Sequence, residues 1–387
     1  MISIKKIKRL FTCGLACLFF SCVTTDFISR EGLSIAQPDV SILYNDWISN
    51  KFELDRIVPI ETTADYIISD VLKRVILYKD KLIILDDNWP SIFVLNAYNG
   101  KVETHINRKG RGPGESRKIL DIAFDDQNEQ ILVYNDYGRL IYFSLEGLFL
   151  KDEKVNHKLY EEMIYHEGNL IFYNHRQGVS CFPYLFDIYN LTDQTWKKLG
   201  TNQKVDFTRR ISGCLLVKSK NIWFAPVLDM CLHMLDMDSN VIKTPYRLDV
   251  KNPLTKELQK KQIKDDFNYF NKHIVERNII YAITSIRETE NYIVFVTNKS
   301  LMMMDKDSHE IHSMKLIKDD YLGTGMLSYY PHDGDDNRIM CIIHSSFWMN
   351  RKPTVQDIPE HLKAQIEMVK VDKNIESNPI LVFYKEK

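Results

Sequence analysis

Residues 82–87 read LIILDD, a short apolar run closed by two polar turn formers, and this pattern recurs along the chain. Five further copies follow at intervals of 49, 39, 52, 70 and 47 residues: ILVYND (131–136), LIFYNH (170–175), IWFA (222–225), YIVFVT (292–297) and IMCII (339–343). Continuous apolar runs of this length, bounded by turn residues, are typical of strands buried on both faces. A unit that recurs six times indicates a repeat architecture.

Each copy has strand-like neighbours that would complete a small sheet. The neighbours of the first two copies are residues 74–78, 92–96, 119–124 and 140–145. A turn then leads to a fourth run, as at Asn99-Gly100, where Asn-Gly favours a type I′ hairpin turn. Four antiparallel strands in each unit is the pattern of a propeller blade. The sequence therefore predicts an all-β fold, a six-bladed β-propeller with two inserted or appended helices.

The two predicted helices interrupt the strand pattern. Asn252 and Pro253 suit the start of a helix, and an apolar stripe at helical spacing follows them to Ile274, between the fourth and fifth units. A second stripe predicts a helix from Ile358 to about Lys370. We expect both stripes to pack on the propeller.

The ends of the chain contribute two strand-like runs that lie outside the repeats. These runs are residues 52–60 and 380–384. A ring of blades leaves its first and last units unpaired unless a strand from one terminus completes a sheet with the other. We therefore expect the terminal strands to meet in one shared sheet.

Composition excludes several classes of protein. Hydrophobic residues make up 44% of the 387 residues and charged residues 27%, which are ordinary globular values. The net charge of −1 argues against a nucleic-acid binder, which would carry a basic face. After the leader, Cys181, Cys214, Cys231 and Cys341 form no CxxC pair and no spaced Cys/His set. We therefore expect neither a zinc site nor any other cofactor.

The N-terminus has the form of a secretory signal. A basic start is followed by an apolar run from Leu10 to Phe20 that is too short to span a bilayer comfortably. Residues 19–22, FFSC, resemble a bacterial lipobox, which implies cleavage before Cys22 and lipid attachment to that residue. The predicted organisation is a signal peptide at 1–21, a lipidated cysteine and tether at 22–50, and a propeller at 51–387. An alternative is an ordinary signal peptide or an uncleaved anchor.

Several segments resemble the six-bladed β-propeller lipoproteins of Bacteroides and related bacteria. These segments are IETT (60–63), LIILD (82–86), RKGRGPGE (108–115) and NPILVFYK (378–385). The resemblance spans residues 50–387, is sharp at both ends, and is weak between about 160 and 350. It implies the propeller fold and an envelope location, lipid-anchored and in the outer membrane. It implies no established activity, and a fold alone does not supply one.

The loop at residues 108–115 is the leading candidate for a binding site. Three glycines and a proline set a tight path on which backbone N–H groups share a concavity. The residues proposed to bind a carboxylate, sulfate or phosphate are Arg108, Lys109, Arg111, Gly112, Gly114 and Glu115. The spacing does not match a P-loop. The alternative is a structural crossover between blades, with Glu115 paired to a nearby arginine.

Other polar or unusual segments have simpler interpretations. Residues 332–337, HDGDDN, offer hard oxygen ligands but lack EF-hand spacing, so a solvated hairpin turn is expected. The pairs 86–87, 135–136 and 174–175 end equivalent strands and are expected to be turn residues, the alternative being a polar channel mouth. His309 and His312 are expected in a surface hairpin, and Met302, Met303 and Met304 in a blade core.

The sequence predicts a non-catalytic binding or interaction module whose partner is a glycan, a peptide or an envelope protein. The membrane is reached only through the N-terminal lipid. One alternative is a propeller enzyme, a lyase or hydrolase acting on carbohydrate or a lactone, whose residues converge from different blades. Another is a structural subunit of an envelope complex. If the protein is an enzyme, we expect acids or histidines that point inward at the channel mouth. If it is a binding module, we expect exposed aromatic or cationic side chains there. If it is a structural subunit, we expect an apolar surface patch.

Overall fold

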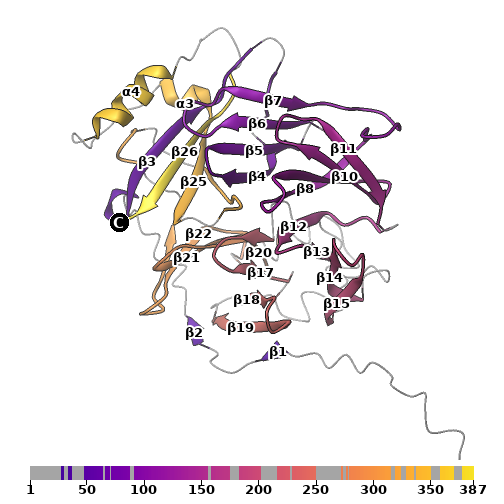
Figure 1. The fold of residues 1–387 in the computed structure, drawn as a ribbon. Coiled ribbons are helices and arrows are strands. Elements are labelled where there is room, and N and C mark those ends of the chain that lie inside the picture. Colours follow the sequence, from indigo (N-terminus) through magenta and orange to yellow (C-terminus); the bar gives the residue numbers. More distant parts are fainter. Residues whose placement is uncertain are drawn as a thin grey trace, which may run out of the picture.

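The computed structural model describes residues 28–29, 34–36, 48–63, 66–69, 71–87, 91–155, 158–174, 183–201, 216–226, 229–249, 272, 276–277, 279–314, 319–323, 328–334, 337–349, 358–369 and 377–387. Within these residues, six sheets follow one another around a ring (Figure 1). The predicted six-bladed β-propeller is confirmed. Among the helices of the described part, none is long and apolar enough to cross a membrane.

The first three blades are four-stranded antiparallel sheets whose strands pair in chain order. Blade 1 contains β4 (Leu72–Tyr78), β5 (Lys81–Asp86), β6 (Ile92–Asn96) and β7 (Val102–Ile106). Blade 2 contains β8 (Ile119–Asp125), β9 (Gln130–Asn135), β10 (Arg139–Ser144) and β11 (Phe149–Lys154). Blade 3 contains β12 (Glu162–His166), β13 (Asn169–Tyr173), β14 (Tyr184–Asn190) and β15 (Trp196–Thr201).

Blades 4 and 6 include strands from distant parts of the chain, whereas blade 5 again pairs its strands in chain order. Blade 4 contains β16 (Val217–Lys218), β17 (Ile222–Phe224), β18 (Cys231–Asp236) and β19 (Val241–Leu248), and two short strands of the predicted tether, β1 (Ile28–Ser29) and β2 (Ser34–Ala36), pair in parallel with β19. Blade 5 contains β20 (Ile283–Glu288), β21 (Tyr292–Thr297), β22 (Leu301–Asp305) and β23 (Ile311–Met314). Blade 6 contains β24 (Ser328–Tyr330), β25 (Arg338–Ile343), β26 (Ile380–Glu386) and β3 (Phe52–Pro59).

The six copies of the sequence repeat correspond to the second strand of each blade. Strand β5 shows why this strand is a continuous apolar run. Leu82 and Ile84 pack with side chains of blade 6, whereas Ile83 and Leu85 pack with side chains of blade 2. Successive side chains point to opposite faces of a strand, and both faces of this blade are covered. The repeats therefore mark positions where neither face meets water.

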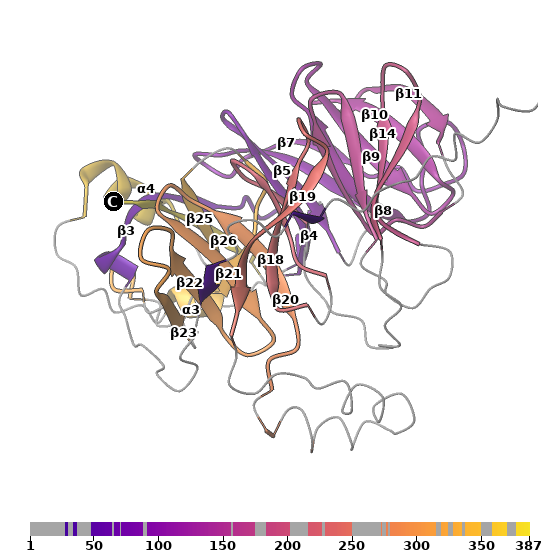
Figure 2. The same cartoon turned by 90° about the horizontal axis from the view of Figure 1, so that it is seen from below.

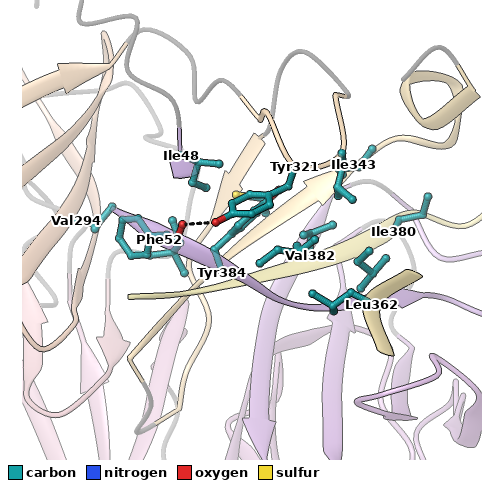
Figure 3. Close-up of a cluster of buried hydrophobic side chains, with 14 of the residues drawn as sticks. Ile48, Phe52, Val294, Tyr321, Ile343, Leu362, Ile380, Val382 and Tyr384 are labelled. Atoms are coloured by element: carbon teal, nitrogen blue, oxygen red, sulfur yellow. Dashed lines mark hydrogen bonds between the residues drawn. The ribbon is translucent and has the colours of Figure 1, made fainter. Parts of the chain in front are cut away.

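The shared sheet of blade 6 closes the ring. Strand β26 pairs antiparallel with β25 and with β3, which confirms the predicted meeting of the terminal strands. Figure 3 shows the buried cluster that covers this sheet, in which the Tyr321 hydroxyl donates a hydrogen bond to the Phe52 carbonyl oxygen (3.1 Å). Leu362 of the nearby helix belongs to the same cluster, so the closing strands are packed as well as paired.

Two α-helices lie in the insertion between β25 and β26 (Figures 1 and 2). Helix α4 (Glu360–Met368) confirms the second predicted helix and packs beside β3, while α3 (Ser345–Met349) was not predicted. A single 3-10 turn, η1 (Ile48–Asn50), precedes β3. The helix predicted from Asn252 to Ile274 lies, apart from residue 272, outside the described residues.

The hairpins between the third and fourth strands share a feature that the sequence analysis missed. In four blades the third strand ends in Asn or Asp, whose side chain accepts backbone N–H bonds, and a residue with positive φ follows four positions later. The pairs are Asn96 and Gly100, Asn190 and Gln194, Asp236 and Asn240, and Asp305 and His309. The predicted type I′ turn at Asn99-Gly100 is wrong, because only Gly100 has positive φ there.

We predict that Leu381→Ala lowers the free energy of unfolding by about 2–5 kcal/mol. Leu381 is fully buried in the closing strand β26 and packs against blade 1, so truncation leaves a cavity at the ring closure. Urea unfolding followed by circular dichroism measures the change. Lys385→Ala in the same strand is the control, because Lys385 is exposed. Equal losses for the two variants would contradict a packed closure.

Candidate functional site

Arg74 of β4 forms a buried ion-pair network at the propeller axis. Its Nε donates to Asp121 on β8 (3.1 Å), Nη2 makes a second contact with the same carboxylate, and Nη1 donates to Asp333 (2.9 Å). Nη1 also donates to the Leu216 carbonyl oxygen (2.9 Å). The three charged side chains are buried. A buried charge is costly unless it is paired and hydrogen-bonded, so breaking these contacts would be unfavourable. The contacts of Arg74 therefore hold blades 1, 2 and 6 to the segment that enters blade 4.

Asp333 lies beside β4, although it belongs to the loop between β24 and β25. Its N–H donates to the Val75 carbonyl oxygen (2.9 Å), and its own carbonyl oxygen accepts from the Leu77 N–H (2.8 Å). The carboxylate also accepts a bond from the Lys218 N–H (2.9 Å). The loop of blade 6 therefore acts as a short parallel strand against blade 1 and reaches across the axis to blade 4.

Arg287 of β20 fixes the same loop from blade 5. It donates to the carbonyl oxygens of His332 (2.6 Å) and Gly334 (3.3 Å). His332 and Asp333 are buried, so the predicted solvated turn is wrong for these two residues; residues 335 and 336 lie outside the described part. The cause is tertiary, because arginines from two other blades supply the donors that water would otherwise provide.

Burial is the largest influence on Asp333 and raises the pKa of its carboxyl group above the ordinary value. The nearby Asp121 carboxylate raises this pKa further, whereas Arg74 and the Lys218 N–H oppose the rise. Two carboxylates thus share one guanidinium in a place with little water. Arg74 supplies the positive charge that both carboxylates contact there.

The first strands of blades 1 to 3 carry a register-equivalent polar residue that the sequence analysis missed. Arg74, Asp121 and Glu162 each lie opposite the fourth residue of the repeated segment, respectively Leu85, Tyr134 and Tyr173. Asp121 and Glu162 then accept backbone N–H bonds at the next blade, from Met163 (2.7 Å) and Leu216 (2.8 Å). Aligning the strand before each repeat would have shown this signal.

A cavity of about 290 Å³, which we call the channel mouth, is lined in part by Asp333 and Gly334 of the blade 6 loop. It is formed where the first strands of blades 1 to 4 reach their turns into the second strands. Its lining residues are Ile76, Leu77, Tyr78, Lys79, Ala123, Phe124, Asp126, Ile164, Tyr165, Lys218, Asp333 and Gly334. The volume lies near the lower end of the roughly 300–1,000 Å³ found for small-molecule sites.

Aromatic and cationic side chains share the wall of this cavity. The rings of Tyr78 and Phe124 lie 4.6 Å apart between centroids, and the Lys218 ammonium lies 5.9 Å from the ring of Tyr165. Lys218 Nζ also lies 3.5 Å from a carboxylate oxygen of Asp126. Flat apolar faces beside an ammonium group suit a ligand that has both a ring or apolar part and a carboxylate.

Lys79 stands at the rim of the cavity. Its ammonium lies 2.7 Å from Glu129, and this hydrogen bond is the largest cause that raises the pKa of Lys79 above its ordinary value. Both side chains are more than half exposed, so solvent screens the pair. The cation at the rim is therefore accessible to a ligand from outside.

The glycine-rich loop predicted as an anion site lies between β7 and β8, at the opposite end of β8 from the cavity. Arg108, Lys109 and Arg111 are all exposed. The Arg108 guanidinium lies 5.8 Å from the ring centroid of Phe143. The three cations are therefore open to solvent on the loop that connects blade 1 to blade 2.

The concavity of this loop holds the chain's own carboxylate. Glu115 accepts a hydrogen bond from the Gly112 N–H (2.8 Å), and a Cβ at Gly110 would lie only 1.9 Å from Glu115 Oε2. Gly114 has φ +72°, and a Cβ there would lie 2.6 Å from the Phe149 ring. Gly110 thus permits close packing around Glu115 and Gly114 permits it against Phe149, and an external anion would have to displace the Glu115 carboxylate.

The remaining candidate residues hold the backbone or lie in a blade core or a hairpin, apart from Cys22. Asp86 accepts from the Ser69 N–H (2.7 Å), and Asn135 holds its own turn by accepting from the Tyr137 N–H (3.0 Å), so their roles in holding the backbone are confirmed. The three methionines of β22 are buried, and His309 lies in the β22–β23 hairpin, both as predicted. Cys22 lies outside the described residues.

The ring of blades and the cavity at its axis define a six-bladed β-propeller with a ligand-sized channel mouth. The chain belongs to the family described as Domain of unknown function (DUF4934), whose model matches residues 44–385. No curated protein matches the chain.

Two solved structures from Bacteroides share the fold. A Bacteroides fragilis protein assigned as exported is 15% identical, with a TM-score of 0.71, and the match covers 92% of this chain and 100% of that one. A DUF4221 family member from Bacteroides vulgatus is 10% identical, with a TM-score of 0.52, and the match covers 87% of this chain and 98% of that one. At these identities the likeness shows the fold.

We predict that Arg74→Met lowers the free energy of unfolding by about 3–5 kcal/mol at neutral pH, because two buried carboxylates lose their cation. The loss should shrink as the pH falls. A carboxyl group whose pKa is raised in the folded state binds a proton more readily when folded, so protonation of Asp333 favours the fold.

Urea unfolding at several pH values measures both effects. Lys363→Met is the control, because Lys363 forms an exposed helical pair with Glu360. A loss for Arg74→Met that stays constant or grows on acidification would argue against the network.

Proposed function

We propose that this chain is an exported binding module of the bacterial cell envelope, anchored by lipid at Cys22. The proposal for export rests on the signal-like leader at residues 1–21 and is supported by the fold neighbour from Bacteroides fragilis that is assigned as exported. The residues 19–22, FFSC, support lipid attachment. The outer membrane is the membrane that the lipoprotein resemblance favours.

We propose that the channel mouth binds a small ligand with a carboxylate beside a ring or apolar group. The observation that carries this proposal is the cavity in which Tyr78, Tyr165 and Lys218 come from three different blades. The cavity floor is preorganised, because the buried Arg74–Asp333 pair fixes it before any ligand arrives. Acidic sugars and peptide carboxyl termini share this chemistry.

We expect Lys218→Met to weaken ligand binding by about 1.5–3 kcal/mol, the usual contribution of a charged hydrogen bond. The bond from the Lys218 N–H to Asp333 uses backbone and survives this change. Tyr78→Leu should also weaken binding. The probes are uronic-acid oligosaccharides with their neutral counterparts, and short peptides with free or amidated carboxyl termini, measured by isothermal titration calorimetry.

Arg108→Met is the matched control, since Arg108 is an exposed cation in the glycine-rich loop at the other end of β8. Binding that survives Lys218→Met but is lost in Arg108→Met would move the site to that loop. Probe binding that neither variant changes, or no binding of any acidic probe, would reject the channel mouth. Chemical turnover of a bound probe would favour the alternative, a propeller lyase or hydrolase.

The proposed lipid anchor at Cys22 can be tested separately. Cys22→Ser should abolish labelling by radioactive palmitate and release the protein from the membrane fraction, because the thiol that carries the lipid is gone. Each buried CH₂ of an acyl chain contributes about 0.8 kcal/mol to membrane binding. Cys17→Ser is the control and should keep both label and membrane association. A labelled, membrane-bound Cys22→Ser variant would reject lipidation at this position.

A further inference from the structure

Three metal-ligating side chains converge at the start of β18 in blade 4. Asp229, Cys231 and His233 each offer one ligand atom, and these atoms lie within 4.8 Å of one another. Cys231 and His233 occupy alternate positions of β18 and therefore share one face, and Asp229 lies two residues before the strand begins. The sequence Asp-x-Cys-x-His thus brings a carboxylate, a thiol and an imidazole together at the start of the strand.

His233 is held with one ring nitrogen toward the other two ligands. Nδ1 lies 2.8 Å from Thr244 Oγ1 on β19, and Nε2 lies 2.9 Å from an Asp229 carboxylate oxygen. The pairing of β18 with β19 shifts register beside His233, between Leu232 and Met234, and such a bulge re-aims a side chain. Metal-bound histidines typically bond through the other ring nitrogen to a carboxylate, a backbone carbonyl or water, and here the Thr244 hydroxyl takes that place.

The surroundings of His233 restrict the orientation of its ring. The His233 ring stacks on Phe224 of the neighbouring strand, with centroids 5.2 Å apart. Asp229 is partly exposed, so the ligand set is open to solvent on that side.

We propose that Asp229, Cys231 and His233 form a binding site for a divalent transition metal of the zinc class. Sulfur, nitrogen and oxygen ligands in one set suit zinc, whereas calcium and magnesium select oxygen ligands. Three protein ligands leave the fourth tetrahedral position to water or another ligand. The site lies at the β17–β18 connection, at the end of β17 away from Lys218, so it is separate from the channel-mouth cavity.

The test is titration of the purified chain with Co²⁺ and then Zn²⁺. We expect one Co²⁺ per chain at this site with a thiolate-to-cobalt charge-transfer absorption, which Zn²⁺ displaces, and a melting temperature that rises with Zn²⁺ and falls with chelator. Cys231→Ala should abolish the absorption, and Asp229→Asn should weaken metal binding. Thr244→Val should weaken it by about 10- to 100-fold, as expected when a ligand histidine loses its orienting partner.

Cys341→Ala is the control, because Cys341 lies buried in β25 of blade 6, and it should keep the absorption. Cys231→Ser and the melting curve of each variant in chelator separate loss of a ligand from loss of the fold. The proposal is overturned if the native chain shows no charge-transfer absorption. It is also overturned if the absorption persists in a folded Cys231→Ala variant, or if only Cys341→Ala removes it.

Discussion

The centre of this propeller depends on the ion pairs that the buried guanidinium of Arg74 forms. The guanidinium pairs with Asp121 of the next blade and with Asp333 from the far end of the chain, where little water can compensate an unpaired charge. Apolar packing between blades is non-directional, and it holds the six sheets side by side. The charged network adds direction, because its hydrogen bonds fix which backbone segment crosses the axis.

The segment that crosses the axis belongs both to the buried charge network and to the proposed binding site. The loop around Asp333 is hydrogen-bonded to blade 1 and blade 4, and Arg287 of blade 5 holds its carbonyl oxygens. This loop closes the floor of the cavity, while Tyr78 and Lys218 stand on its walls. A ligand would thus meet a surface whose shape was set by folding. The candidate metal site lies apart from this floor and forms differently: Cys231 and His233 alternate along β18, beside a bulge, and Asp229 precedes the strand.

The repeated strand made the architecture predictable, whereas the candidate sites were only partly predictable. The apolar runs of LIILDD and its copies are buried between two blades, so their apolar character is required at six places and is visible without coordinates. The loop at residues 108–115 was noticed for its glycines, but no pattern showed that Glu115 would occupy its own concavity. The candidate ligands of blade 4 were missed because Asp-x-Cys-x-His at residues 229–233 matches neither a CxxC pair nor the Cys/His spacings of the common zinc motifs.

The amino-acid sequence by itself determined the strand repeat, the number of blades and the closure by terminal strands, because these follow from local burial and from the need to pair exposed edges. Only the tertiary structure decided which polar residues are buried and which partners they bond. His332 and Asp333 are followed by further acids and look like a solvated turn, yet Arg74 and Arg287, distant in sequence, bury them. The physical reason is that a polar side chain is satisfied by whichever partner the fold brings near, and that partner leaves no local pattern.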